Sequence, residues 1–463
     1  MIDIDREHQE FSQKARVLDM YRDLYAGGET FKRRAGHYLL RRQKEPLDVY
    51  SERLYRVFYE NYIGSIVDWY ASTLFRREPS LHLDGGMESG REFLGQFTED
   101  CDLRGTSLSS FFRECFVDAL VAGRSHILLD FPRATELPQN RAEEDKAGLS
   151  RAFLVRYQAE ELVNWSEDER GEYEWVVLRH KLKRQRSIDS PEVVEETYWH
   201  YYDRTEYRTY RRIEDEDSPA GAGIQLIAQG LHGLARQHRV PVFTLQFGDG
   251  LWLMNRAAHL QLEHFNKSNA LGWAITMGLF AMPVIYSDRE WSQIVGESYY
   301  IQLGPNDKFG WTEPDGKVYQ IAADNLERLK EEIYRVCYLS QASGEMIAGH
   351  AQSAQSKQLD FTITQEILRA YAALVKDCIR RVITAINQAR EDGITISVSG
   401  LDEVDIADFG TELQQATSLL QLGIDSPTLK RQIYERLALK YLNDARQDIK
   451  DQIAREISAQ FSK

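Results

Sequence analysis

The spacing of apolar residues changes from one region of the chain to the next. In the first 75 residues they recur three and four positions apart, as in YSERLYRVFYENYIGSIVDWYASTLF, a spacing typical of amphipathic helices. This pattern stops before Pro79, and HLDGG at 82–86 predicts a turn. Two more helical patterns end at Gly123, and SHILLDFP then predicts a strand. This part of the chain is therefore expected to be mainly helical.

Residues 150–250 alternate between apolar and polar positions. Strands are predicted at RAFLVRYQ, YEWVVLRHKLKRQ, ETYWHYYDRTEYRTYRRI and VPVFTLQFG, with charged loops between them. We expect a largely antiparallel sheet. The third strand mixes aromatic residues with arginines, a mixture that also occurs in nucleic-acid stacking platforms, but a half-exposed sheet carries the same residues at period two, and we favour that interpretation. The residues are Tyr198, Trp199, Tyr201, Tyr202, Tyr207 and Tyr210 with Arg204, Arg208, Arg211 and Arg212.

The order of the next segments is more informative than any one of them. A long helix is predicted at about 253–280, followed by a strand-and-turn stretch and a second helix at about 324–341. After it comes ASGEMIAGHAQSAQSK, whose small polar residues can contribute little to a core. A helix predicted at about 358–391 then begins.

That last helix has one apolar stripe, and Gly393 marks its end. The stripe consists of Ile363, Ile367, Tyr371, Leu374, Val375, Cys378, Ile379, Val382 and Ile386. A short strand, ITISVSG, and a helical tail follow it. Taken together, the patterns predict an α+β protein that is mainly helical.

The composition is that of a globular protein, with 43% hydrophobic and 28% charged residues and only 11 Pro and 30 Gly. No stretch approaches the ~20 consecutive apolar residues that a membrane helix needs, and MIDIDREHQEFSQK lacks the layout of a secretory signal. We therefore expect no association with a membrane, and we expect the protein to be synthesised in the cytoplasm. The four cysteines form no CxxC pair, and we expect all of them to be buried: Cys101, Cys115, Cys337 and Cys378.

The formal net charge of −15, from 57 Lys plus Arg and 72 Asp plus Glu, disfavours a protein that coats nucleic acid. An acidic wall repels a duplex and keeps it mobile, so the charge is compatible with a conduit for DNA.

Motifs of common enzyme sites are absent from the sequence. It has no GxxxxGK[ST], GxGxxG, HExxH or GxSxG motif, so we expect no catalytic site, no metal and no cofactor. His259 and His264 are five residues apart, which places them about 140° apart around a helix, and we expect both on the surface. The sequence GRSH at 123–126 lacks the second glycine of a nucleophile turn.

Three segments resemble the portal proteins of tailed bacteriophages. SGEMIAGHAQSAQSKQLDFTITQEILRAYAALVKDCIRRVITAINQARE looks like the tunnel loop and long helix of that family. RVPVFTLQFGDGLWLMNRAAHLQLEHFNKSNALGWAITM looks like the strand that enters its first stem helix, and GLDEVDIADFGTELQQATSLLQLGIDSPTLKRQIYERL resembles its ending. The resemblance begins at about Tyr50, and the first fifty residues match loosely.

The resemblance implies a portal-like subunit with an α/β wing, a helical stem, a β-containing clip, a long wing helix and a helical crown. The implied regions are 1–250 for the wing, 251–282 for the first stem helix, 283–322 for the clip, 323–342 for the second stem helix, 343–357 for the tunnel loop, 358–392 for the long helix and 393–463 for the crown.

The implied function is a homo-oligomeric ring of twelve subunits at the capsid vertex of the virion, through which double-stranded DNA passes. The implied partners are the terminase packaging motor, head-completion or adaptor proteins, and capsid and scaffolding proteins. In the tunnel loop, the expected DNA-facing residues are His350, Gln352, Gln355 and Lys357. In the clip, the expected docking residues are Trp291, Tyr299, Tyr300 and Trp311, although these rings could equally fill the core of the insert.

Two other function classes remain open at this point. A cytosolic scaffold or adaptor would use the helices for protein partners and have no role with DNA, and it would stay a monomer or small oligomer. A metal-independent hydrolase with unrecognised motifs is the weakest alternative.

Overall fold

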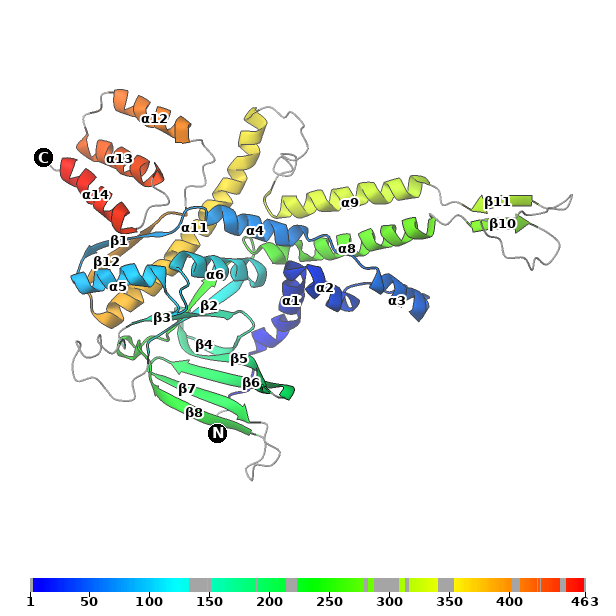
Figure 1. The fold of residues 1–463 in the computed structure, drawn as a ribbon, viewed down its shortest axis with the longest axis horizontal. Helices are drawn as coiled ribbons and strands as arrows, with labels where there is room; N and C mark the ends of the chain where they lie inside the picture. The colour runs from blue at the N-terminus through cyan, green and yellow to red at the C-terminus, as the bar shows by residue number, and fades with distance from the viewer. Residues whose placement is uncertain are drawn as a thin grey trace. The chain divides into compact units, whose positions relative to one another are not determined.

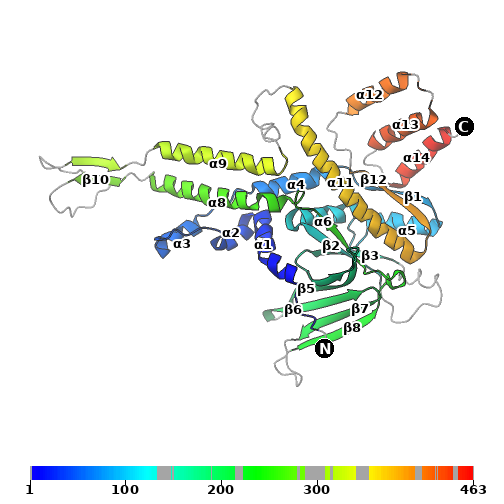
Figure 2. The same ribbon diagram turned by 180° about the vertical axis from the view of Figure 1, so that it is seen from behind.

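The computed structural model forms two compact units, each described by itself below (Figures 1 and 2). Unit 1 comprises 1–21, 67–255 and 352–463, and unit 2 comprises 22–66 and 256–351. Residues 22–66 thus group with 256–351, and the implied division into wing, stem, clip and crown stays a prediction. The structure describes residues 3–132, 148, 151–188, 190–213, 223–278, 282–286, 308–312, 316–339, 354–401, 409–422, 424, 426–441 and 447–461.

Unit 1 contains three sheets and most of the helices. Its helices are α1 (Gln9–Ala26), α4 (Tyr62–Leu74), α5 (Glu88–Glu99), α6 (Leu108–Ala122), α11 (Ala354–Arg390), α12 (Phe409–Gln421), α13 (Pro427–Tyr441) and α14 (Gln447–Phe461). Parts of α1 and α4 belong to unit 2. The smaller sheets are β1 (Ser80–Gly85) with β12 (Ile394–Ser399), and β3 (Phe153–Gln158), β2 (Arg124–Asp130) and β9 (Val242–Gln246) in that order. The largest sheet has the order β4 (Leu162–Glu167), β5 (Tyr173–Ser187), β6 (Ser190–Asp203), β7 (Glu206–Ile213) and β8 (Gly223–Leu231).

Unit 2 contains α2 (Gly28–Arg34), η1 (Ala35–His37), α3 (Leu47–Tyr55), most of α8 (Leu253–Gly278), β10 (Met282–Tyr286), β11 (Lys308–Thr312) and α9 (Gly316–Val336). The protein is therefore mixed α+β and mainly helical, as the sequence predicts. None of the described helices is long and apolar enough to span a membrane.

The predicted strand at 196–213 is in fact two strands, β6 and β7. The chain reverses at Asp203, whose carboxylate accepts hydrogen bonds from the backbone N–H groups of Thr205 (2.8 Å) and Glu206 (2.7 Å). A short acidic side chain that bonds its own backbone in this way stabilises a tight turn. All neighbouring strands of this sheet pair antiparallel, as expected. The sequence analysis missed β4 and β8.

The predicted turn at 82–86 is also wrong over most of its length. Residues 82–85 lie in β1, which pairs antiparallel with β12, and Gly86 follows the end of the strand. Gly85 and Gly86 both have positive φ, a conformation that suits a residue without Cβ. The partner strand is more than 300 residues away in the chain, so local pattern gave no sign of it.

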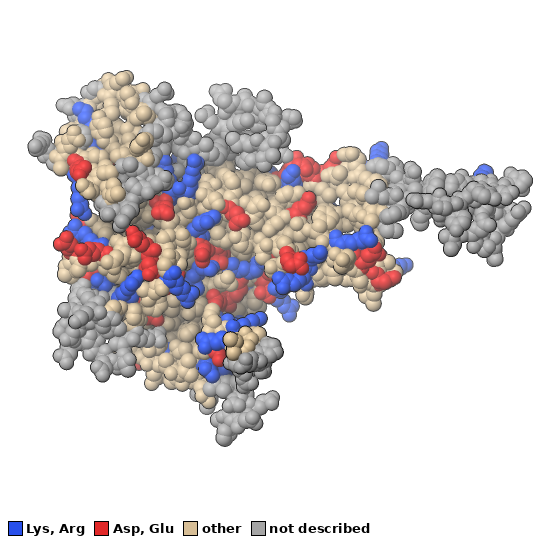
Figure 3. Space-filling model, viewed as in Figure 1, with Lys and Arg blue, Asp and Glu red and all other residues tan. Residues whose placement is uncertain are grey.

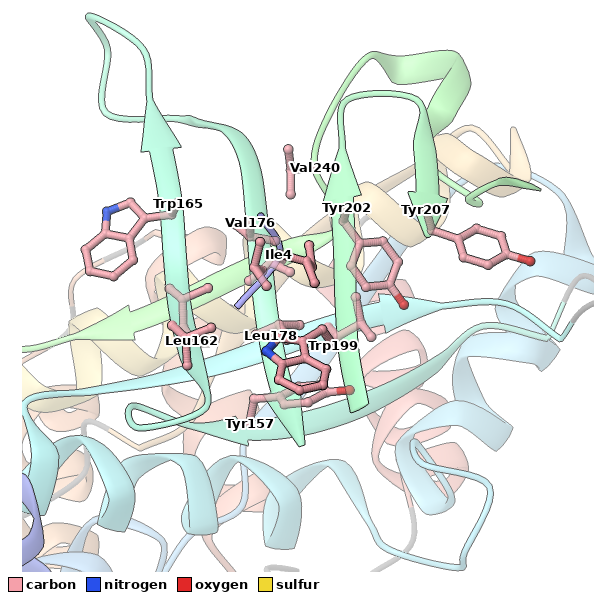
Figure 4. Packing of buried hydrophobic residues seen from close by; sticks show 14 of the residues in the cluster. Ile4, Tyr157, Leu162, Trp165, Val176, Leu178, Trp199, Tyr202, Tyr207 and Val240 are labelled. Atoms are coloured by element: carbon pink, nitrogen blue, oxygen red, sulfur yellow. The ribbon is translucent and has the colours of Figure 1, made fainter. Parts of the chain in front are cut away.

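The main core of unit 1 lies between the five-stranded and three-stranded sheets (Figure 4). Trp199, Tyr202 and Tyr207 point into it from the larger sheet, and Leu128 and Tyr157 contribute from the smaller one. Three of the six aromatics that could have formed a nucleic-acid platform are therefore buried. The interpretation as a half-exposed sheet is confirmed.

Helix α11 buries its apolar stripe from Leu368 onward, including Cys378 at its centre. The other three cysteines are buried too, as expected. Ile363, predicted in the same stripe, is 60% exposed instead. The helix begins at Ala354, four residues before the predicted start.

His126 is completely buried at the centre of unit 1 on β2. Its Nδ1 lies 2.9 Å from the hydroxyl of Thr244, whereas Nε2 has no hydrogen-bond partner among the described residues. Burial, and secondarily the charge of Arg124, lower the pKa of His126 to about 3. The ring is therefore neutral in the folded protein.

Acid should destabilise unit 1 through His126. The pKa of His126 is lower in the folded protein than in the unfolded chain. The unfolding free energy that depends on the neutral ring is therefore fully present above the ordinary pKa of about 6.5 and is lost as the pH falls towards 3. Between pH 7 and pH 5 the wild type should lose about 2 kcal/mol more unfolding free energy than a His126→Asn variant, measured by urea denaturation. His259→Asn, at an exposed position, should retain the wild-type slope. Equal slopes for all three proteins would contradict the assignment.

Candidate functional site

Unit 2 is dominated by a long hairpin of two helices that ends in two strands (Figures 1 and 2). The chain runs out along α8 and β10 and returns along β11 and α9. At 1.5 Å per residue, the 26 residues of α8 span about 39 Å. α9 begins at Gly316, earlier than the predicted 323, so its first turns belong to the segment expected as the insert.

Side-chain contacts fix the register of this hairpin. Arg256 on α8 donates to the carbonyl of Val336 (2.8 Å), and Lys267 contacts the amide oxygen of Asn325 (3.0 Å). Eleven residues thus separate the contact points on each helix, as required for two antiparallel helices that run side by side. The strands continue the same pairing, with Met282 opposite Thr312. The two helices are therefore antiparallel to each other, and so are the two strands.

Three side-chain amides of α8 hold the segment 38–63 against the helix. Each amide donates to a backbone carbonyl and accepts from a backbone N–H, so it replaces a peptide partner. Gln261 donates to Glu60 (2.7 Å) and accepts from Ile63 (3.4 Å). Asn266 bonds in the same way to Tyr38 (3.1 Å) and Leu40 (2.9 Å), and Asn269 bonds to both the carbonyl (2.9 Å) and the N–H (3.1 Å) of Phe58.

Gln261, Asn266 and Asn269, hereafter the three amides, supply hydrogen-bond partners to backbone groups of the irregular segment. Buried backbone groups without a partner cost free energy, and much of 38–63 lies outside regular secondary structure. The sequence analysis did not identify the three amides. The only signal was the presence of uncharged polar residues inside a long apolar helix.

Aromatic rings fill the space beside the three amides. Phe31 stacks on Tyr59 with ring centroids 4.0 Å apart, and Phe265 meets Phe31 edge-on at 5.0 Å. The Tyr59 hydroxyl donates to the carbonyl of Leu24 (2.9 Å), and burial raises the pKa of this phenol. The base of the hairpin is therefore a rigid, well-packed structure.

His264 is buried in the same base and is not the surface residue that the sequence analysis expected. Its Nε2 lies 3.5 Å from the carboxylate of Glu60, and its ring meets Tyr62 edge-on. Burial lowers the pKa of His264, and the nearby Glu60 charge acts in the opposite direction. His259, five residues earlier, is exposed as expected.

The outer parts of the hairpin expose large apolar side chains. Val318 and Ile321 on α9 are 63% and 61% exposed, and Ile275 on α8 is 43% exposed. Val318 and Ile321 are three residues apart and therefore lie on one face of the helix. Exposed apolar side chains on one face of a helix can form part of a surface that binds protein.

Unit 1 has a polar cavity of about 410 Å³ between β9 and α11. Arg239 lies there with Arg381, and burial lowers the pKa of Arg239, with Arg381 adding repulsion. Arg381 donates to the carbonyl of Thr244 (3.1 Å) and pairs with Asp377 (3.0 Å). Cations and anions both line the cavity, so it favours no ligand of one charge. Within the described residues, no group of three or more His, Cys, Asp or Glu side chains could hold a metal ion.

Most residues expected to act on DNA or on partners fall where the structure gives no description. His350, Gln352, Trp291, Tyr299 and Tyr300 lie outside the described residues.

The remaining three expected residues lie in regular elements. Gln355 and Lys357 belong to the first turn of α11, not to a loop that ends at 357. Trp311 lies in β11 opposite Pro283. The roles assigned to these residues remain predictions.

No protein-family model matches the chain, and no curated protein matches it. Two solved structures share part of its arrangement. A chain of "Neck of empty GTA particle computed with C6 symmetry" is 12% identical with a TM-score of 0.41, over 79% of this chain and 87% of that one. A chain of "Virion of native gene transfer agent (GTA) particle" is 11% identical with a TM-score of 0.36, over 78% and 86%. Identities and TM-scores this low assign neither a fold nor a function to this chain.

Removing one of the three amides should destabilise the hairpin base. Asn269→Leu leaves the carbonyl and N–H of Phe58 without their partner, and we expect a loss of about 2–4 kcal/mol in unfolding free energy. Urea denaturation measures this loss. His259→Ala, at an exposed position on the same helix, should cost less than about 1 kcal/mol. A loss at Asn269 as small as the control's would show that water replaces the amide.

Proposed function

We propose that this chain is the portal subunit of a tailed bacteriophage, a virion protein that assembles into the ring through which double-stranded DNA is packaged and ejected. The proposal has no catalytic step, because the chain would act as a structural conduit. The observation that carries it is the antiparallel pair of helices α8 and α9, which flank the β10–β11 pair in the chain and both expose apolar residues. The resemblance of the sequence segments gives this geometry its specific interpretation.

The hairpin suits a ring for a physical reason. In a cyclic assembly each subunit binds its neighbours through two different surfaces. Ile275 on α8 and Val318 with Ile321 on α9 expose apolar side chains on two helices, and a neighbour on each side would cover them. Burying such side chains contributes roughly 1.5–3 kcal/mol each, and a ring repeats this contribution in every subunit.

Within this proposal the region 283–322 would dock the packaging motor first and head-completion proteins later. The β10–β11 pair lies at the end of the hairpin farthest from the base, where it would be accessible after ring closure. The proposal does not depend on the likeness to the two particle structures.

The direct test is particle imaging of the purified chain by negative stain. A portal subunit should form closed rings with a central hole. The alternative function, a scaffold or adaptor without a DNA role, predicts a monomer or a small open oligomer, and that outcome would refute the proposal.

A charge on the exposed face of α9 should prevent ring formation. Val318→Glu with Ile321→Glu puts carboxylates where a neighbour must bury apolar side chains, so the ring fraction should fall at least about tenfold. The control is Ala323→Glu, an exposed position about 140° around the helix from Val318. Light scattering coupled to size exclusion reports the oligomer, and circular dichroism checks the fold. Normal rings from the double variant would exclude this face from the interface.

A second variant tests the passage of DNA. The sequence predicts that Lys357, repeated around the ring, makes a weak cationic contact with phosphates at the narrowest part of the channel. Lys357→Glu should leave ring assembly intact and reduce DNA packaging or retention in a packaging assay, and Lys376→Glu on the same helix provides a matched charge change. Full packaging after replacing His350, Gln352, Gln355 and Lys357 together with Ala would remove these residues from DNA handling.

A further inference from the structure

One stretch of unit 2 has a charge opposite to that of the chain as a whole. Between positions 32 and 44 the sequence has six cations and no Asp or Glu. All six are exposed, and we call them the basic surface: Lys32, Arg33, Arg34, Arg41, Arg42 and Lys44. Without them the chain has 51 cationic against 72 anionic residues, a net charge of −21. Elsewhere, on the face in Figure 3, cations and anions are interspersed.

Apolar groups accompany the basic surface. Leu40 and Leu47 are 68% and 67% exposed, and Tyr55 at the end of α3 is 80% exposed. A hollow of about 190 Å³ in the same unit has both apolar and polar lining residues: Leu39, Phe58, Gly272 and Trp273 with Arg53, Arg56, Asn269 and Thr276. This volume is sufficient for one apolar side chain of a partner.

The structure holds this region rigidly before any partner binds. Asn266 fixes the backbone of Tyr38 and Leu40. A buried ion pair joins Arg53 to Glu45 at 2.7 Å, with both side chains at most 5% exposed. A surface ordered in advance loses little conformational entropy on binding, which favours a docking role.

Two classes of partner would suit the cations, and the apolar groups decide between them. Nucleic acid is bound non-specifically by cations at phosphates, and this binding does not need exposed leucines. Protein interfaces combine an apolar centre with a polar, charged rim, which is the combination seen here. The rest of this same chain supplies the opposite charge.

We propose that the basic surface and its hollow dock onto a second copy of this chain, the neighbouring subunit, whose other residues carry a net charge of −21. The inference rests on the proposed ring and adds the surface through which one subunit recognises the next. The charge difference steers the two copies into one orientation, and an apolar side chain of the neighbour fills the hollow.

Charge reversal tests the inference in the full-length protein. Arg41→Glu, Arg42→Glu and Lys44→Glu are combined in one variant. The control combines Lys181→Glu, Lys183→Glu and Arg184→Glu on β5, three exposed cations whose reversal changes the net charge equally. Sedimentation velocity at 0.1 M salt should show association at least about tenfold weaker for the first variant than for the control. At 0.5 M salt the difference should shrink to less than about threefold, because salt screens exposed charges.

The other outcomes are distinct. Rings equal to the control's at both salt concentrations would overturn the inference while leaving the proposed function intact, whereas a wild type without rings would overturn the proposed function itself. A gel-shift experiment with a 30-base-pair duplex tests binding to nucleic acid. If the charge-reversal variant forms normal rings but no longer binds the duplex, the inference is overturned in favour of a DNA-binding surface. If the triple variant fails to fold, Arg42→Gln with Lys44→Gln replaces it, and unchanged association at 0.1 M salt would again count against the inference.

Discussion

The three amides of α8 are the interaction on which the rest of unit 2 depends. Gln261, Asn266 and Asn269 each satisfy one carbonyl and one N–H of a chain segment that cannot satisfy them by itself. Because the segment 38–63 is fixed in this way, its apolar rings can pack on the helix and its charged residues are held at the surface. A helix with only apolar residues at these positions would leave six backbone groups without their partners.

Contacts between α8 and α9 fix the position of one helix along the other, starting from that base. Arg256 and Lys267 contact α9 at matching intervals, so a helix fixed at its base determines where α9 lies. A rigid projection can present Val318 and Ile321 to a neighbour at a defined position. A flexible projection would first have to lose that freedom on binding. Rigidity therefore connects packing inside unit 2 to the proposed assembly.

Unit 1 is organised differently, around burial between sheets. Trp199 and Tyr157 pack between the larger and the smaller sheet, and His126 lies neutral in the interior. The cavity beside Arg381 contains cations and anions together, which suits local ion pairing better than ligand binding. The charges that distinguish this protein lie elsewhere, in the contrast between the basic surface and an acidic chain.

The sequence by itself determined those features that depend on local periodicity. The buried stripe of α11, including Cys378, follows from apolar residues at helical spacing, and the antiparallel strands around Trp199 follow from alternation. The α+β class follows from the order of these patterns. The two helices flanking a short β insert could be placed for the same reason, apart from the early start of α9.

Only the tertiary structure decided which polar residues are buried and what they bind. Asn269 and His264 look like surface residues in a sequence, because their partners Phe58 and Glu60 lie about 200 positions away. β1 could not be distinguished from a turn without its partner β12, and Ile363 is 60% exposed although its spacing places it in the apolar stripe. Periodicity reports the faces of one element. Burial and hydrogen bonding depend on which distant element covers each face, and that information exists only once the chain has folded.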